Sequence, residues 1–173
     1  MIVKSVPSKE ITDILTDELK FAIEFAKSVN RGRVITRAAF DKLTETIPSQ
    51  DYPLDRFQVD YDHDMNRKDH SNILNVMDLL KADQCTNTTY YCSKTFMGWH
   101  TNSNNVGKRT YVTYSVEPAI FKYYDYKTNQ VVIDYDFKGW TQREFMVSSD
   151  NLFWHCVYAP SMRFAYGFNT HTV

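Results

Sequence analysis

The feature that most constrains the fold is a series of short strand-like segments in the C-terminal half of the chain. Each segment is rich in β-branched and aromatic residues, and Asn, Gly, Pro, Asp and Ser gather between them. The segments are 110–115, 120–124, 131–135, 141–147, 152–157 and 162–168. No helical pattern interrupts them, which argues against βαβ crossovers and a parallel sheet. The pattern therefore predicts an antiparallel sandwich or jelly roll.

Helical patterns dominate the first half of the chain. Apolar residues recur at three- and four-residue spacing from Ile11 to Ala26, and Ser8 is a candidate N-cap. We expect two shorter helices at 37–45 and 72–82, a short strand and a surface loop within 57–70, and a strand at 88–92. The predicted class is α+β, with one domain over 1–173. In it, a helical and mixed support region (1–97) packs outside a β-barrel core (98–168).

Composition argues against several classes of function. Aromatic residues reach 15% of the 173 residues, with 12 Tyr and 11 Phe, which favours pleated, half-buried surfaces. The net charge of −1 argues against a nucleic-acid or acidic-lipid surface. No apolar run approaches the roughly 20 residues of a membrane span, and no secretion signal is readable. Three cysteines without a CxxC motif favour a reducing cytoplasm, the host cytoplasm if the protein is viral.

Two histidines have matching surroundings, because His100 and His155 each follow a tryptophan. Strands distant in sequence lie side by side in a jelly roll, so the two imidazoles could converge. The alternative is a pair of core aromatics with hydrogen-bonded imidazoles. Arg163 follows His155 by eight residues in the apolar run MRFAYGF. Burying this guanidinium requires an anion, either a ligand carboxylate or a protein Asp or Glu.

These residues resemble the double-stranded β-helix of the 2-oxoglutarate- and Fe(II)-dependent oxygenases, a jelly-roll or cupin-like fold. That family carries a His-x-Asp/Glu pair, a distant second His and a basic residue beyond it. The corresponding residues here are His100-Thr101-Asn102, His155 and Arg163. The segment also resembles uncharacterised bacteriophage members of this superfamily. The resemblance covers residues 98–168.

The resemblance implies an iron enzyme. Two imidazoles and a third ligand would hold Fe(II), with His100, Asn102 and His155 in those roles. The 2-oxo acid group of 2-oxoglutarate would bind the metal, and its far carboxylate would bind Arg163. No catalytic residue beyond the metal ligands is implied, because the cofactor carries the difficult chemistry.

The sequence departs from the family at position 102, where Asn replaces the carboxylate. Three interpretations stay open. Asn102 ligates through its side-chain oxygen, or Glu144 or Asp136 takes its place, or the protein has lost iron chemistry and kept the fold. Some members of the superfamily lack this carboxylate and use a halide instead, so its absence does not by itself imply inactivity.

Several other residues have two possible roles. Tyr111 and Tyr114 could help to hold the co-substrate carboxylate, or could pack in the core. They lie three apart on a strand, so only one can point inward. Arg109 and Arg143 could bind an anionic substrate, although solvated surface is the preferred interpretation. We expect a solvated loop for the Asp62-His63-Asp64 motif.

The sequence favours an oxygenase that hydroxylates an unidentified substrate. The alternative is a catalytically degenerate jelly-roll protein with a binding or structural role in a phage. A third class, a nucleic-acid-binding module, rests only on exposed aromatics that could stack bases. No motif identifies the substrate or the oligomeric state, and specificity is expected in the N-terminal part and in loops 49–70 and 101–108.

Overall fold

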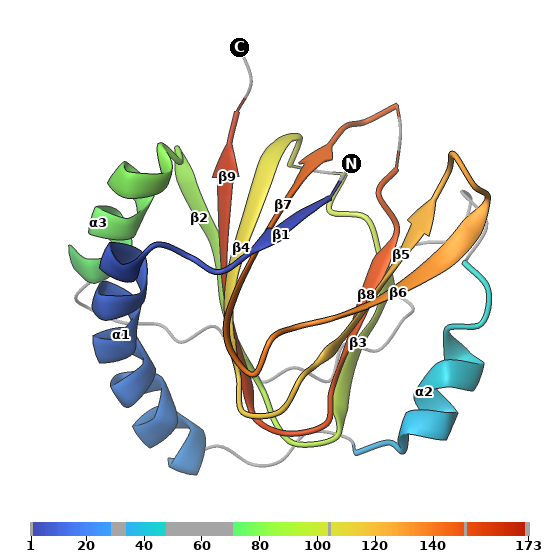
Figure 1. Ribbon diagram of the computed structural model, residues 1–173, viewed down its shortest axis with the longest axis horizontal. Helices are drawn as coiled ribbons and strands as arrows, with labels where there is room; N and C mark the ends of the chain where they lie inside the picture. The colour runs from blue at the N-terminus through green and yellow to red at the C-terminus, as the bar shows by residue number, and fades with distance from the viewer. Residues whose placement is uncertain (1, 29–33, 48–70, 104, 151, 172–173) are drawn as a thin grey trace.

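The protein folds into two antiparallel sheets that face each other, with helices on their outer faces (Figure 1). The computed structural model describes residues 2–28, 34–47, 71–103, 105–150 and 152–171, with side chains to residue 24 in the first range. Every strand pair in both sheets is antiparallel among these residues. This arrangement is an α+β fold compatible with a β-sandwich.

The larger sheet has five strands in the order β1-β7-β4-β9-β2. They are β1 (Val3–Ser5), β7 (Gly139–Val147), β4 (Gly107–Ser115), β9 (Arg163–Thr170) and β2 (Gln84–Tyr91). The smaller sheet has four strands in the order β3-β8-β5-β6. They are β3 (Thr95–His100), β8 (His155–Ala159), β5 (Ile120–Asp125) and β6 (Gln130–Tyr135). Strands adjacent in each sheet are therefore mostly distant in sequence.

Two helices cover the outer face of the larger sheet, on the left of Figure 1: α1 (Lys9–Ser28) and α3 (Ser71–Leu80). The Ser8 hydroxyl accepts a hydrogen bond from the Ile11 backbone N–H at 3.3 Å, as an N-cap does. The apolar stripes of the helices pack on outward-facing side chains of the sheet. The buried set comprises Ile11, Leu15, Leu19, Ala22, Ile73, Val76, Tyr90, Cys92, Val112, Phe164, Tyr166 and Phe168.

Helix α2 (Arg37–Leu43) lies beside the smaller sheet, on the right of Figure 1. Its start is capped by Thr36, whose side chain accepts a hydrogen bond from the Ala39 backbone N–H at 3.1 Å. Phe40 is fully buried and stacks on Tyr158 with ring centroids 5.2 Å apart. Burying such a ring stabilises the fold by roughly 1.5–3 kcal/mol, which docks this short helix.

Strand alternation sends every second side chain into the space between the sheets. On β4, Arg109 and Tyr111 face this interior, whereas Val112 and Tyr114 pack toward α1 and α3. On β8, His155 and Val157 face the interior, and Cys156 and Tyr158 pack on the outer face with Phe40. The interior therefore receives polar as well as apolar side chains.

The predicted helices and the antiparallel α+β class are confirmed, but several predicted boundaries are wrong. The β core does not begin at residue 98, because β1, β2 and the first part of β3 contribute strands from within 1–97. Strand β1 is only three residues long, and β3 contains Gly98 and an irregular register, so neither has a clear alternating pattern. The predicted strand and loop at 57–70, with the Asp62-His63-Asp64 motif, lie outside the described residues.

Candidate functional site

His100 and His155 meet between the two sheets, as their spacing suggested. His100 is the last residue of β3 and His155 the first of β8, and they are directly opposed in the antiparallel pairing. Their ring centroids lie 4.0 Å apart. The antiparallel register, rather than proximity in sequence, therefore brings the two imidazoles to one place.

Both rings are held in the same tautomer by backbone carbonyls. Nδ1 of His100 lies 2.8 Å from the Gly98 carbonyl oxygen, and Nδ1 of His155 lies 2.9 Å from that of Phe153. A carbonyl can only accept, so each Nδ1 carries the proton and each Nε2 keeps its lone pair. This arrangement is common for histidines that bind metals through Nε2.

Both histidines are neutral at physiological pH. Burial lowers the pKa of His100 to about 4, against a hydrogen bond to Gly98 that favours the charged form, and the Arg109 charge lowers it further. Burial and the neighbouring His100 also hold the pKa of His155 well below its ordinary value. Neutral imidazole is the form that binds metals.

Asn102 completes the group and lies beside His155. Its Nδ2 atom lies 3.3 Å from Nε2 of His155 and 3.3 Å from the Tyr111 hydroxyl oxygen. A half-turn of the amide would bring Oδ1 to the same place. The backbone of Asn102 has a φ of 53°, in the left-handed region that Asn and Asp tolerate better than other non-glycine residues.

Tyr111 and Tyr114 lie on opposite faces of β4. Tyr111 lines the interior near His155, with ring centroids 6.5 Å apart. Burial raises the pKa of its phenol, so Tyr111 stays protonated and can donate a hydrogen bond. Tyr114 packs instead on Trp140 with ring centroids 5.2 Å apart, on the face covered by helices. The predicted role for Tyr114 in binding a co-substrate is therefore wrong.

A cavity of about 270 Å³ opens beside the histidines. Side chains from both sheets and from the loop after β3 line it. They are Thr86, Asn87, Thr89, Tyr91, Met97, His100, Asn102, Asn105, Arg109, Tyr111, Phe121, His155, Val157, Arg163 and Ala165. Two of these side chains are cationic and none of the lining residues that the structure describes is acidic, so the cavity has a positive bias.

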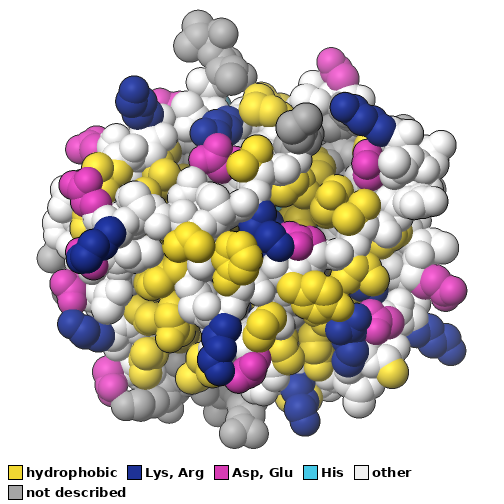
Figure 2. Space-filling model, viewed as in Figure 1, with side chains coloured by type: hydrophobic (Ala, Val, Ile, Leu, Met, Phe, Trp, Pro, Cys, Tyr) yellow, Lys and Arg dark blue, Asp and Glu magenta, His cyan; other side chains and the backbone are white. Residues whose placement is uncertain are grey.

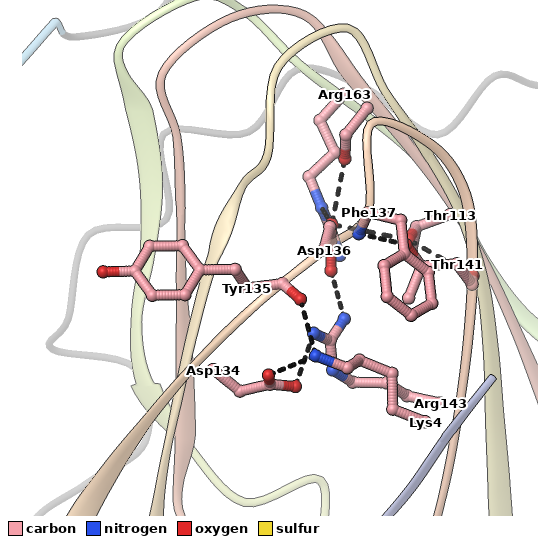
Figure 3. Close-up of polar contacts among 10 residues, drawn as sticks. Lys4, Thr113, Asp134, Tyr135, Asp136, Phe137, Thr141, Arg143 and Arg163 are labelled. Atoms are coloured by element: carbon pink, nitrogen blue, oxygen red, sulfur yellow. Dashed lines mark hydrogen bonds and ion pairs between the residues drawn. The ribbon is translucent and has the colours of Figure 1, made fainter. Parts of the chain in front are cut away.

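Arg163 lines the cavity, but a protein carboxylate already binds it. Its Nε donates to Oδ2 of Asp136 at 2.8 Å (Figure 3). Its guanidinium lies 4.9 Å from the centroid of the Tyr91 ring. Asp136 also pairs with Arg143 and accepts a hydrogen bond from the Ser115 hydroxyl at 2.9 Å. Burial opposes ionisation of Asp136, but the two arginine charges outweigh it and hold its pKa below the ordinary value.

Neither carboxylate that was considered as a substitute for Asn102 reaches the histidines. Asp136 is engaged by Arg143 and Arg163, as Figure 3 shows. Glu144 pairs with Lys108 at 2.8 Å and accepts a hydrogen bond from Gln142. Both substitutes are therefore wrong, and of the described residues Asn102 is the third polar side chain beside the two imidazoles.

Arg109 and Arg143 are not surface residues, contrary to the preferred interpretation. They expose 2% and 1% of their area. Arg109 lies on the same face of β4 as Tyr111, two residues away, so strand alternation was the signal that could have placed it inside. Arg143 binds Asp136 and Asp134 between the sheets, and Lys4 from β1 also pairs with Asp134 (Figure 3).

The remaining histidines and thiols lie away from the cavity or outside the described residues. His171 contacts Asp83 through its backbone N–H and through Nδ1. His63 and His70 lie outside the described residues. Cys156 is buried on the outer face of the smaller sheet, and burial raises the pKa of its thiol. A Cys156–His155 nucleophile is therefore excluded, because the two side chains point to opposite faces.

The donor set fits a divalent transition metal better than a hard cation. Two neutral imidazoles that keep their Nε2 lone pairs and one amide side chain, which contacts Nε2 of His155, gather at one end of the cavity. The described residues contain no cluster of three His, Cys, Asp or Glu side chains, so any such site here is one carboxylate short of the usual facial triad.

Comparison with protein-family models gives no match, and comparison with curated proteins gives none either. Within the described ranges, the helices are too short or too polar to cross a membrane. The case for a function therefore rests on the geometry of the cavity.

Proposed function

We propose that the protein is a 2-oxoglutarate/Fe(II)-type oxygenase on a double-stranded β-helix. The strand order supports this fold, because β2-β9-β4-β7 and β3-β8-β5-β6 interleave in the sequence as the strands of a jelly roll do. His100 ends β3 and His155 begins β8, so the two imidazoles that the family resemblance pairs lie directly opposite each other in the smaller sheet.

The observation that carries the proposal is the opposed pair of neutral imidazoles, protonated at Nδ1 and with their Nε2 lone pairs available, at the wall of a cationic cavity. His100 and His155 would hold the metal, and Asn102 would offer its Oδ1 as a third, neutral ligand. Iron with bound 2-oxoglutarate would supply the activation of dioxygen for attack on a substrate C–H bond.

The chain's own residues prepare the cavity for such chemistry. The Gly98 and Phe153 carbonyls hold the two rings in the tautomer that presents Nε2. Phe121 and Phe153 each stack against His155, at centroid distances of 5.6 and 5.3 Å, and exclude water from one side of it. Tyr111 positions Asn102 through its hydroxyl.

Metal titration tests this proposal. Calorimetry with Mn(II) should show one site in the wild-type protein and none in His100→Ala or His155→Ala. Anaerobic addition of Fe(II) and 2-oxoglutarate should give a weak visible charge-transfer band. The His171→Ala variant is the matched control, because His171 lies at the exposed end of β9 and should leave both signals unchanged. Absence of metal binding in the wild-type protein would reject the oxygenase.

The second candidate function is a metal-free binding protein on the same fold, which Asn102 favours. An amide brings no negative charge to offset a divalent cation, and it already donates toward Nε2 of His155. In that case His100→Ala and His155→Ala should leave ligand binding intact. A nucleic-acid ligand is not favoured, because cationic and anionic side chains are interspersed over the face in Figure 2.

A further inference from the structure

The cavity contains a buried cation that no described carboxylate neutralises. The Arg109 side chain enters from the middle of the larger sheet and is 2% exposed. Its Nη2 donates to the Asn105 carbonyl oxygen at 3.2 Å, and its Nε has no partner among the described residues. Burying a guanidinium that no described carboxylate pairs with is costly, so this position favours the binding of an anion.

Charges elsewhere in the interior do not offset Arg109. Among the described residues, the other buried cations between the sheets are Arg143 and Arg163, which share Asp136, and Asp134 binds Arg143 and Lys4. This ion network of three cations and two carboxylates already has one positive charge in excess. Lys122, also buried, pairs with Asp41 of α2. Asn169, directly opposite Arg109 on β9, is an amide and can supply a hydrogen bond but no charge.

Arg109 also lies close to the candidate metal ligands. Its charge acts on His100, His155 and Tyr111, and all four side chains line the same cavity. Neutral donors surround the remaining space, among them the Asn87 and Thr89 side chains. A guanidinium fork with neutral hydrogen-bonding neighbours suits a carboxylate bound in two-point contact.

We propose that Arg109, and not Arg163, is the residue that binds the carboxylate of a small anionic ligand in this cavity. The inference deepens the proposed function and rests on it for the ligand class, a 2-oxo acid or related dicarboxylate. Arg163 has a structural role in this arrangement, since Asp136 occupies its Nε and offsets its charge.

Carboxylate binding in matched variants tests the inference. Calorimetry with 2-oxoglutarate and with succinate, with and without Mn(II), compares the wild type with Arg109→Gln and Lys108→Gln. The two variants remove one positive charge from adjacent residues, but Lys108 is 41% exposed and pairs with Glu144 on the outer face. Loss of a charged two-point contact should weaken binding at least about tenfold in Arg109→Gln. Lys108→Gln should bind as the wild type does.

A spectroscopic measurement of ligand binding on the wild-type protein complements the affinities and needs a variant only to assign the resonance. In the wild-type protein, succinate should shift the Arg109 Nε–Hε resonance, assigned by its loss in Arg109→Lys, and leave that of Arg143 unchanged. Unchanged affinity in folded Arg109→Gln, or an unshifted Arg109 resonance at saturating succinate, would overturn the inference. The metal titrations, with the histidine variants as controls, separate the two proposals. If the protein binds carboxylates through Arg109 but binds no metal at the histidines, the oxygenase is rejected and the anion site stands. If it binds metal at the histidines but Arg109→Gln binds carboxylates as the wild type does, the anion site is rejected and only the metal site stands.

Discussion

Removing the Asp136 charge should cost far more stability than removing the neighbouring Asp134 charge. Asp136 is 3% exposed and accepts hydrogen bonds from Arg163, Arg143 and the Ser115 hydroxyl. Breaking a buried ion pair from one side costs about 3–5 kcal/mol. In Asp136→Asn, Arg143 keeps Asp134, and Arg163 alone loses its carboxylate, so we expect the lower end of the range, about 3 kcal/mol.

The control is Asp134→Asn, which removes a carboxylate whose side chain is 26% exposed. Partly solvated pairs contribute about 0–1 kcal/mol, so the two variants should differ by about 2 kcal/mol or more. Urea unfolding followed by the fluorescence of the buried Trp99 and Trp154 measures both free energies. Adding Arg163→Met to Asp136→Asn should recover stability, since it removes the unpaired cation. Equal losses in the two single variants, or no recovery in the double variant, would refute this explanation.

Three further predictions concern acid stability, the metal ligand and the cavity wall. Because the pKa of Asp136 is lower in the folded than in the unfolded protein, its ionised carboxylate adds to the free energy of unfolding above pH ~4, and this addition is lost as the pH falls through the folded-state pKa. The free energy of urea unfolding should therefore fall below pH ~4 in the wild type, and Asp136→Asn should largely lack this fall. Asn102→Asp should tighten Mn(II) binding at least about tenfold in calorimetry, because it adds a negative charge beside His155; unchanged affinity would exclude position 102 from the metal site. Gly167→Ala should destabilise the protein by about 1–3 kcal/mol in the same unfolding assay, because the new Cβ would clash with the Asn87 amide oxygen and lie 2.8 Å from the Tyr111 ring. Wild-type stability of this variant would show that the Asn87 and Tyr111 side chains can move aside.

Periodicity was enough to predict the helices and most strands, because each of these elements buries one continuous face. Helix α1 illustrates this, since Leu15, Leu19 and Ala22 repeat at helical spacing and all pack on the larger sheet. The pairing of His100 with His155 was predictable only from the expected jelly-roll strand order and from the spacing of histidines in the family that the segment resembles. No local pattern reports that β3 and β8 are neighbours.

The charged interior could not be read from the sequence. Asp136 follows the end of β6 in an alternating, polar stretch, and nothing local shows that it turns inward to meet Arg143 and Arg163. For Arg109, strand alternation places the side chain on the same face of β4 as Tyr111, but nothing local shows that this face lies between the sheets. Long-range strand order decides which of these side chains become buried, and that order depends on the packing of both sheets.

The left-handed backbone of Asn102 has an evolutionary consequence. Asn and Asp are among the few residues that this conformation accepts at low cost, and their codons differ by a single nucleotide. One point mutation can therefore exchange a neutral side chain for a charged one beside His155 while the loop after β3 keeps its shape. Under the proposed function, position 102 is thus where a single substitution changes the charge of the metal site without remodelling the backbone.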